Sequence, residues 1–159
     1  MNGTTTYLHF DGNCRTAMAF YRACLGGELE VMAYPDASGQ PDADPEARVM
    51  HSRLASGGKT LLMASDHPTG TGRSTGDSRC SVFVDCSAGD EVDGLFAALS
   101  RDGQVTVAPA DMPSGRFGMC TDPFGVAWIL HCAASCTRGG NADNMPIPPV
   151  AAACGPSTP

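Results

Sequence analysis

The sequence is short of positive charge and has no long apolar run. Its 159 residues contain 10 Lys and Arg against 17 Asp and Glu, a formal net charge of −7. Nucleic acid and anionic membranes are therefore not expected as partners, because phosphate binding needs a basic stripe. No apolar stretch approaches the length of a bilayer span, and no secretory signal is recognisable. We expect a cytoplasmic protein.

The chain also lacks the paired cysteines of a zinc or redox motif. None of its eight cysteines forms a CxxC pair, and Cys132 and Cys136 beside His131 are too incomplete a set to predict a zinc site. Without a secretory signal we expect reduced thiols, mostly buried as small apolar groups. The glycine-rich stretch at 70–76 contains no Gly-Lys-Ser/Thr, so a phosphate-binding loop is not expected.

What the chain does have is a globular composition with many turns. Hydrophobic residues make up 42% and charged residues 17% of the sequence, as is typical of a folded domain. The 19 glycines and 12 prolines cluster at 35–46, 66–78 and 137–159, which we interpret as loops and a tail. We expect a single domain at residues 1–133 and a disordered tail at 134–159.

The residues before the tail repeat one pattern of elements. Residues 5–34 and 79–107 each predict a strand, an amphipathic helix, a turn and a second strand, the latter at 104–107 in the second unit. Two further short strands follow each unit, so the repeat is roughly sixty residues long. The sequence therefore predicts an α+β domain of two tandem βαβββ modules, at 5–65 and 79–132.

Alternation along the outer strands assigns faces to their side chains. On the first strand it favours Leu8 and Phe10 as pocket-lining residues and places His9 on the opposite face. The turn that follows ends in Asn13, a residue type that commonly caps a helix N-terminus. On the last strand, the parity of His131 lets this residue reach the mouth of the pocket.

Short motifs also follow one another in a set order along residues 5–132. They are Tyr7-Leu8-x-Phe10-x-Gly12-Asn13-Cys14, Ala17-Met18-Ala19-Phe20-Tyr21, Leu25-Gly26-Gly27, Met50-His51-Ser52, Leu61-Leu62-Met63-Ala64-Ser65-Asp66, Arg116-Phe117-Gly118 and Asp122-Pro123-Phe124-Gly125-x-x-Trp128. In this order they resemble the PhnB-like branch of the vicinal oxygen chelate superfamily, which includes glyoxalase I, bleomycin-resistance proteins and extradiol dioxygenases.

The resemblance implies two βαβββ modules whose curved sheets form an open, partial barrel, usually in a homodimer, with a ligand pocket on the concave side. Metal enzymes of the superfamily place His, Gln or Glu ligands on the first and fourth strands of each module. The matching positions here are Thr6, Met63, Arg79 and Ile129, none of which is a usual ligand of a divalent ion. We therefore expect no metal and no other cofactor at that site.

The candidate ligand-binding residues are basic, aromatic or apolar. A guanidinium such as that of Arg79 could hold a carboxylate or phosphonate through two hydrogen bonds, or pair with Asp77 or Glu91 in solvent. The aromatic and apolar candidates could line the pocket or pack in the core. The full set is Leu8, Phe10, His51, Met63, Arg79, Phe83, Arg116, Phe117, Ile129 and His131.

Two functions stay open at this point. The first is a PhnB-like protein that binds a small organic molecule in a dimer's pocket without the family metal. The second is a lyase or dioxygenase-type enzyme that uses a relocated metal held by His9, His51 or His131, or an Arg/His acid-base pair. The label of a ubiquinone-pathway methyltransferase is sometimes given to PhnB-like chains. We do not expect that activity, because no Gly-rich loop after a strand suggests binding of S-adenosylmethionine.

Overall fold

The computed structural model describes residues 3–68 and 80–134, which form two modules with the same element order. The first module consists of β1 (Thr6–Phe10), α1 (Cys14–Leu25), β2 (Glu28–Ala33), β3 (Val49–Ser56) and β4 (Lys59–Asp66). The second consists of β5 (Val82–Asp85), α2 (Gly89–Leu99), β6 (Gln104–Met112), β7 (Gly115–Thr121) and β8 (Ala127–Ala133). The predicted α+β duplication is confirmed. Arg79 and residues 135–159 of the expected tail lie outside the described residues.

Each module folds into a four-stranded mixed sheet with the same strand order. The first sheet has the order β1-β4-β3-β2 and the second has the order β5-β8-β7-β6. In both sheets the first strand of the module runs parallel to its last strand, and the other neighbouring strands are antiparallel. The repeat in the sequence therefore corresponds to a structural duplication.

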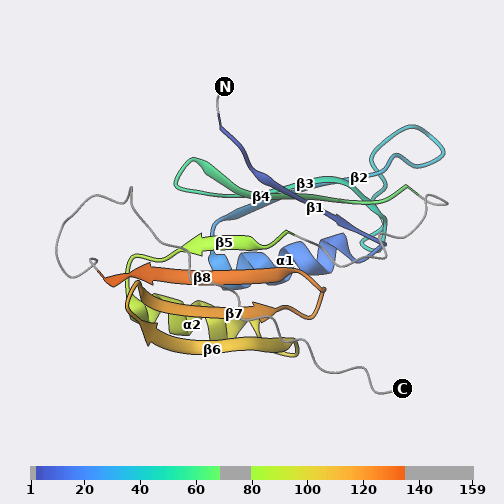
Figure 1. Cartoon of the computed structure of the whole chain (residues 1–159). Coiled ribbons are helices and arrows are strands. Elements are labelled where there is room, and N and C mark those ends of the chain that lie inside the picture. Colours follow the sequence, from blue (N-terminus) through green and yellow to red (C-terminus); the bar gives the residue numbers. More distant parts are fainter. Residues whose placement is uncertain (1–2, 69–79, 135–159) are drawn as a thin grey trace, which may run out of the picture.

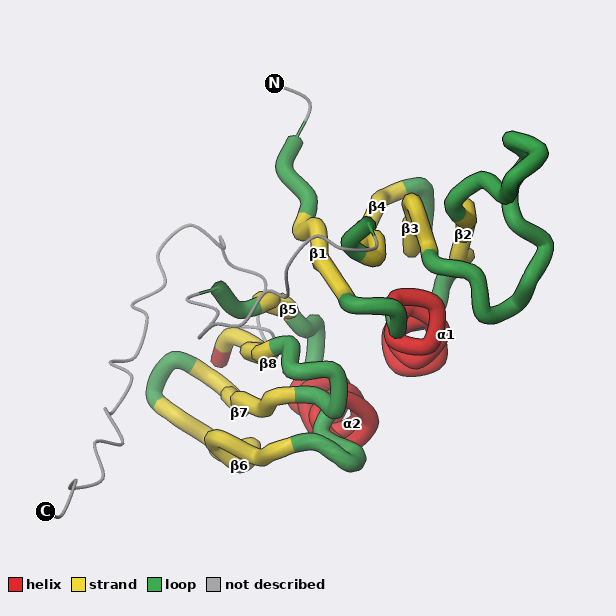
Figure 2. The backbone as a smooth tube through the Cα atoms, turned by 90° about the vertical axis from the view of Figure 1, so that its right-hand side faces the viewer, coloured by secondary structure: helices red, strands yellow, loops and turns green. Residues whose placement is uncertain are grey.

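The two helices lie beside each other in the angle between the sheets (Figure 2). Helix α1 covers one face of the first sheet, and α2 covers one face of the second (Figure 1). The core between helices and sheets includes the fully buried side chains of Tyr21, Leu54, Leu99 and Trp128. The sheets share no strand pairing in residues 3–68 and 80–134, so this part of the chain forms no closed barrel. None of its helices has the length and apolar character of a membrane span.

The side chains of β1 alternate in the opposite phase to the expected one. Phe10 is 6% exposed and lies in the core, and Leu8 packs against the core. Tyr7, which is 41% exposed, and His9 lie on the face without a helix. Leu8 and Phe10 therefore lie on the helix-covered face and not on the face opposite the helix. Both alternating sets of this strand contain aromatic residues, so the pattern does not show which set the helix covers.

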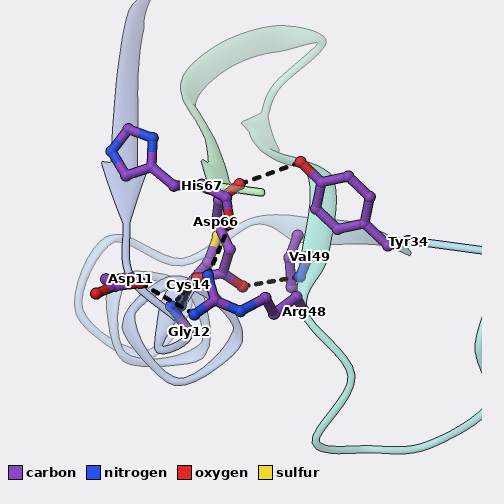
Figure 3. Close-up of polar contacts among 8 residues, drawn as sticks. All are labelled: Asp11, Gly12, Cys14, Tyr34, Arg48, Val49, Asp66 and His67. Atoms are coloured by element: carbon purple, nitrogen blue, oxygen red, sulfur yellow. Dashed lines mark hydrogen bonds and ion pairs between the residues drawn. The ribbon is translucent and has the colours of Figure 1, made fainter. Parts of the chain in front are cut away.

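The N-terminus of α1 is capped from β4. Asn13 makes no side-chain capping hydrogen bond. Instead, the Oδ1 atom of Asp66 accepts hydrogen bonds from the backbone N–H groups of Gly12, at 2.7 Å, and Cys14, at 3.0 Å (Figure 3). Its Oδ2 atom accepts a third from the N–H of Val49 at 2.8 Å. Asp66 is 2% exposed, so a buried carboxylate fixes the helix to the sheet it covers.

A second buried carboxylate links the two modules. The Oδ2 atom of Asp122 accepts hydrogen bonds from the hydroxyl of Tyr21 in α1 at 2.7 Å and from the indole N–H of Trp128 at 2.8 Å. Its Oδ1 atom accepts the N–H groups of Phe124 and Val126 within the turn before β8. Burial and the neighbouring Asp122 carboxylate raise the pKa of Tyr21 above its ordinary value, so the phenol stays a donor.

Candidate functional site

Each sheet leaves one face without a helix, and these faces carry the sequence-predicted site residues that the structure brings together. We call them the first and second open faces. In strand register, the first open face carries Tyr7, His9, Glu30, Met32, His51, Arg53, Met63 and Ser65. The second carries Phe83, Asp85, Val107, Phe117, Met119, Ile129 and His131. Figure 2 shows that the two faces are turned in different directions within one chain.

Imidazole and phenol groups gather on the first open face. The Tyr7 hydroxyl lies 3.2 Å from Nδ1 of His51. The Tyr7 ring is 5.1 Å from that of His9, centroid to centroid. His9 in turn stacks on His67 at 5.1 Å, with an interplanar angle of 14°, and its Nδ1 atom lies 3.4 Å from the Ser65 hydroxyl. The cluster thus brings together three imidazoles, a phenol and a hydroxyl, which can donate and accept hydrogen bonds.

The second open face is more apolar. The imidazole of His131 lies between two phenyl rings, with centroid distances of 6.3 Å to Phe83 and 6.5 Å to Phe117. Phe83 is 50% exposed, whereas His131 is only 1% exposed. Ile129 and Met119 continue the face in register with Phe83. A flat apolar molecule would find aromatic contacts here.

A cleft of about 450 Å³ lies between the modules. Most of its wall is apolar, with Lys59, Asp85 and Glu91 as charged groups at its surface. Its apolar lining comes from both modules and consists of Leu25, Leu61, Leu62, Val82, Phe83, Val84, Leu95 and Trp128. Phe83 belongs to this cleft and to the second open face. The volume of the cleft lies within the range found for small-molecule pockets.

The structure separates the predicted site residues into three groups. His51 and Met63 lie on the first open face. Four others lie together on the second open face, namely Phe83, Phe117, Ile129 and His131. Leu8 and Phe10 belong to the helix-covered side, as described above, and Arg79 is outside the described residues.

Arg116 lies on neither of the two open faces. Its Nε atom is 2.8 Å from Oδ1 of Asp93, and its Nη1 atom is 2.9 Å from Oδ1 of Asp111. Hydrogen bonds to Asp93 and then Asp111 raise the pKa of its guanidinium. Arg116 lines a separate hollow of about 350 Å³ near the start of α2. Two carboxylates of the same chain already neutralise its charge, so Arg116 is less available to bind an anionic ligand.

Of the positions that match the family's metal ligands, Met63 and Ile129 lie on the open faces, Thr6 does not, and Arg79 is outside the described residues. Thr6 pairs with Leu62, whereas Tyr7 pairs with Met63, and the matching pair of the second module is Phe83 and Ile129. Side chains at these four open-face positions are therefore Tyr, Met, Phe and Ile, a poor donor set for a hard divalent ion.

Nor do the histidines assemble into one relocated site. His9 and His51 lie on the first open face and His131 on the second. Across residues 3–68 and 80–134, no three His, Cys, Asp or Glu side chains are placed to hold one metal ion together.

The buried thiols are poorly suited to nucleophilic chemistry. Burial, the largest cause in each case, raises the pKa of Cys14, Cys86 and Cys120 to about 11. At neutral pH these thiols are protonated, and the thiolate is the reactive form. The structure thus supports the expectation of small buried groups for these three cysteines.

The sequence reasoning missed several residues of the site. Tyr7 was not among the candidates, although its shared strand parity with His9 marks it as an open-face residue. His67 lies just after β4 and gave no periodic signal. Leu61, Leu95 and the other cleft residues meet only when the modules pack, and a duplication predicts two such units without predicting how they dock.

Comparison with known proteins identifies the family. Residues 2–131 match the model of the family described as 3-demethylubiquinone-9 3-methyltransferase. The chain is 27% identical to Protein YjdN of Escherichia coli strain K12, over 79% of this chain and 91% of that protein. Protein PA1353 from Pseudomonas aeruginosa is 36% identical, with a TM-score of 0.71, over 84% of this chain and 98% of that structure.

Two further solved structures place the fold in its superfamily. A PhnB protein from Bacillus cereus is 28% identical, with a TM-score of 0.67, over 83% of this chain and 100% of that structure. An enzyme of the glyoxalase/bleomycin resistance protein/dioxygenase family from Burkholderia phytofirmans is 14% identical over 81% of this chain and 96% of that structure, and its TM-score of 0.55 shows a shared fold. The chain belongs to the 3-demethylubiquinone-9 3-methyltransferase family, in the PhnB-like branch of the vicinal oxygen chelate superfamily.

Proposed function

We propose that this protein binds a small organic molecule in the cytoplasm without using the superfamily's metal site. The observation that carries the proposal is the inter-module cleft of about 450 Å³, which both modules line with mainly apolar side chains. A half-exposed aromatic ring, Phe83, stands where the cleft meets the second open face. Burying an apolar ligand there would remove its surface and that of the ring from water.

Metal independence is supported by the residues that pair across the first and last strands of each module on the open faces. Tyr7, Met63, Phe83 and Ile129 offer one phenol and one thioether, whereas hard divalent ions take several carboxylate, carbonyl or imidazole groups. These positions instead make apolar and aromatic contacts possible, as binding of an amphipathic molecule requires.

We propose a homodimer as the working form. Several apolar side chains of the open faces and their rims are exposed in the single chain, among them Tyr7, Met32, Leu61 and Phe83. The two open faces point in different directions, so a second copy could set the first open face of one chain against the second open face of the other. Such packing would cover apolar surface and enclose a pocket.

The test compares two arginine substitutions at similarly exposed positions. Phe83→Arg places a charge in the cleft, whereas Val105→Arg places it on β6, outside the cleft lining and outside both open faces. Phe83 and Val105 are 50% and 54% exposed. The probe is 8-anilinonaphthalene-1-sulfonate, followed by fluorescence titration in buffer with EDTA. We expect saturable binding to the wild type, an affinity at least about tenfold lower for Phe83→Arg, and little change for Val105→Arg.

Equal loss of affinity in both variants, or binding that never saturates, would contradict a site in the cleft. Wild-type binding that is saturable without EDTA and lost in its presence would contradict metal independence. Sedimentation equilibrium on the same samples tests the dimer, and a single-chain mass at every concentration would rule it out.

An enzyme remains the second candidate because of the cluster on the first open face. The Tyr7 hydroxyl next to Nδ1 of His51 and the stacked His9 and His67 rings supply acid-base groups. Metal bound in a one-to-one ratio, with stabilisation that His9→Gln abolishes, would favour this candidate. We do not propose the methyltransferase activity named in the family's description, since no Gly-rich loop for S-adenosylmethionine follows a strand in residues 3–68 and 80–134.

A further inference from the structure

His131 presents a buried hydrogen-bond acceptor that no described residue pairs with. Its Nε2 atom lies 3.2 Å from the carbonyl oxygen of Ser114. A carbonyl only accepts, so Nε2 carries the proton and the lone pair of the neutral ring is on Nδ1. That Nδ1 atom is buried and has no hydrogen-bond partner among the described residues. Buried polar atoms are nearly always paired, so one that is not calls for an explanation.

The surroundings of His131 indicate what would pair with Nδ1. The rings of Phe83 and Phe117 flank the imidazole on the second open face. Phe83 stands on β5, the edge strand of its sheet, and is half exposed. A bound ligand would take the place of this exposed ring next to His131, while Phe117 stays in place. A planar ligand could then pack against the aromatic side chains while its own N–H or O–H reaches Nδ1.

The negative charges near His131 favour neutral ligands of this kind over anionic ones. Asp85 is the cross-strand partner of His131 on the second open face, and the whole chain carries a formal charge of −7. Both disfavour a carboxylate or phosphate next to the imidazole. A neutral donor suffers no such repulsion.

We propose that His131 anchors a neutral aromatic ligand by accepting a hydrogen bond at Nδ1 from a ring N–H or O–H. This inference rests on the proposed binding function and specifies the ligand class at the second open face.

The test uses two probes that differ in one donor. Indole has a ring N–H, whereas 1-methylindole has the same ring system with a methyl group in its place. We expect calorimetric titration to show indole binding to the wild type about tenfold more tightly, the value of roughly one hydrogen bond. The imidazole ¹⁵N signal of Nδ1 should shift on addition of indole and not on addition of 1-methylindole.

Two substitutions separate the two ring nitrogens. His131→Gln keeps an amide N–H that can reach the Ser114 carbonyl but removes the acceptor at Nδ1. His131→Asn places a side-chain oxygen near the former Nδ1 position and removes the bond to Ser114. We expect the preference for indole to disappear in His131→Gln, with unchanged affinity for 1-methylindole, and to persist in part in His131→Asn.

Equal affinity of the wild type for both probes, failure of both to bind, or a preference that survives in His131→Gln would overturn the inference. Should either variant fail to fold, the probe comparison and the ¹⁵N shift in the wild type still decide it. The proposed function is tested separately, because His131 does not line the cleft. Saturable, Phe83-dependent dye binding without an indole preference would reject the anchor alone.

Discussion

Two adjacent glycines after α1 differ in what a side chain would meet. Gly26 and Gly27 both have positive φ, at 73° and 92°. A Cβ atom on Gly26 would have no heavy atom within 4 Å, whereas one on Gly27 would collide with the carbonyl oxygen of Ala55 in β3. The turn therefore needs glycine at the first position for conformation and at the second for space as well.

The two alanine variants should separate these effects. Gly26→Ala should lower the free energy of unfolding by about 1 kcal/mol through backbone strain. Gly27→Ala should lower it by about 3 kcal/mol, because the backbone of β3 must also move. Urea denaturation followed by circular dichroism measures both. Equal losses would show that the contact with Ala55 relaxes at no cost.

At the same scale, the sequence predicted the residue types of the site better than the face of the sheet on which each side chain lies. Met63 and Ile129 were placed through the family resemblance and His131 through its shared parity with Ile129, and the register puts all three on the open faces. On β1, the faces of Leu8 and His9 could not be predicted, since which set is buried depends on where α1 docks. Nor could an orphan acceptor such as Nδ1 of His131 be foreseen, because hydrogen-bond satisfaction is a property of the folded chain.

At the scale of elements, α1 depends on a side chain far away in sequence. Asp66→Ala would leave three backbone N–H groups without their acceptor, those of Gly12, Cys14 and Val49. We expect a loss of about 3 kcal/mol in unfolding free energy, measured by urea denaturation. Asp11→Ala serves as the control, since it removes an exposed ion pair with Arg48 and should cost less than about 1 kcal/mol. Similar losses in the two variants would refute the capping role.

The elements themselves were largely predictable, with instructive differences. Turn glycines and alternation gave the order strand, helix, strand, strand, strand in both modules. The strand expected at 104–107 extends to Met112 as β6, although it contains Pro109. Pro109 falls at a register shift between Val107 and Ala110 in this edge strand, a position where the missing N–H is tolerated. The capping role of Asp66 could not be predicted from the residues around α1, because Asp66 lies at the end of β4, far from the helix in the sequence.

At the scale of the whole molecule, the hydroxyl of Tyr21 is a link between modules. Tyr21→Phe would remove the hydrogen bond from α1 to Asp122 while Trp128 still donates to the same carboxylate. We expect the free energy of unfolding to fall by about 1 to 2 kcal/mol, followed through the fluorescence of Trp128. The control is Tyr34→Phe, which removes a longer, 3.3 Å bond to the Asp66 carbonyl within one module. A larger loss for Tyr34→Phe would speak against the link.

The pairing of the first and last strands has a consequence for how each module associates and folds. Thr6 to Phe10 of β1 run along Leu62 to Asp66 of β4, so contact between them closes a loop that spans nearly the entire module. This closure carries a large entropic cost and favours late addition of β1 during folding. Until β1 adds, the N–H and C=O groups along one side of β4 stay unpaired and can accept a strand from another chain. The first strand of each module thus covers the open side of the module's last strand and becomes the new edge of the sheet.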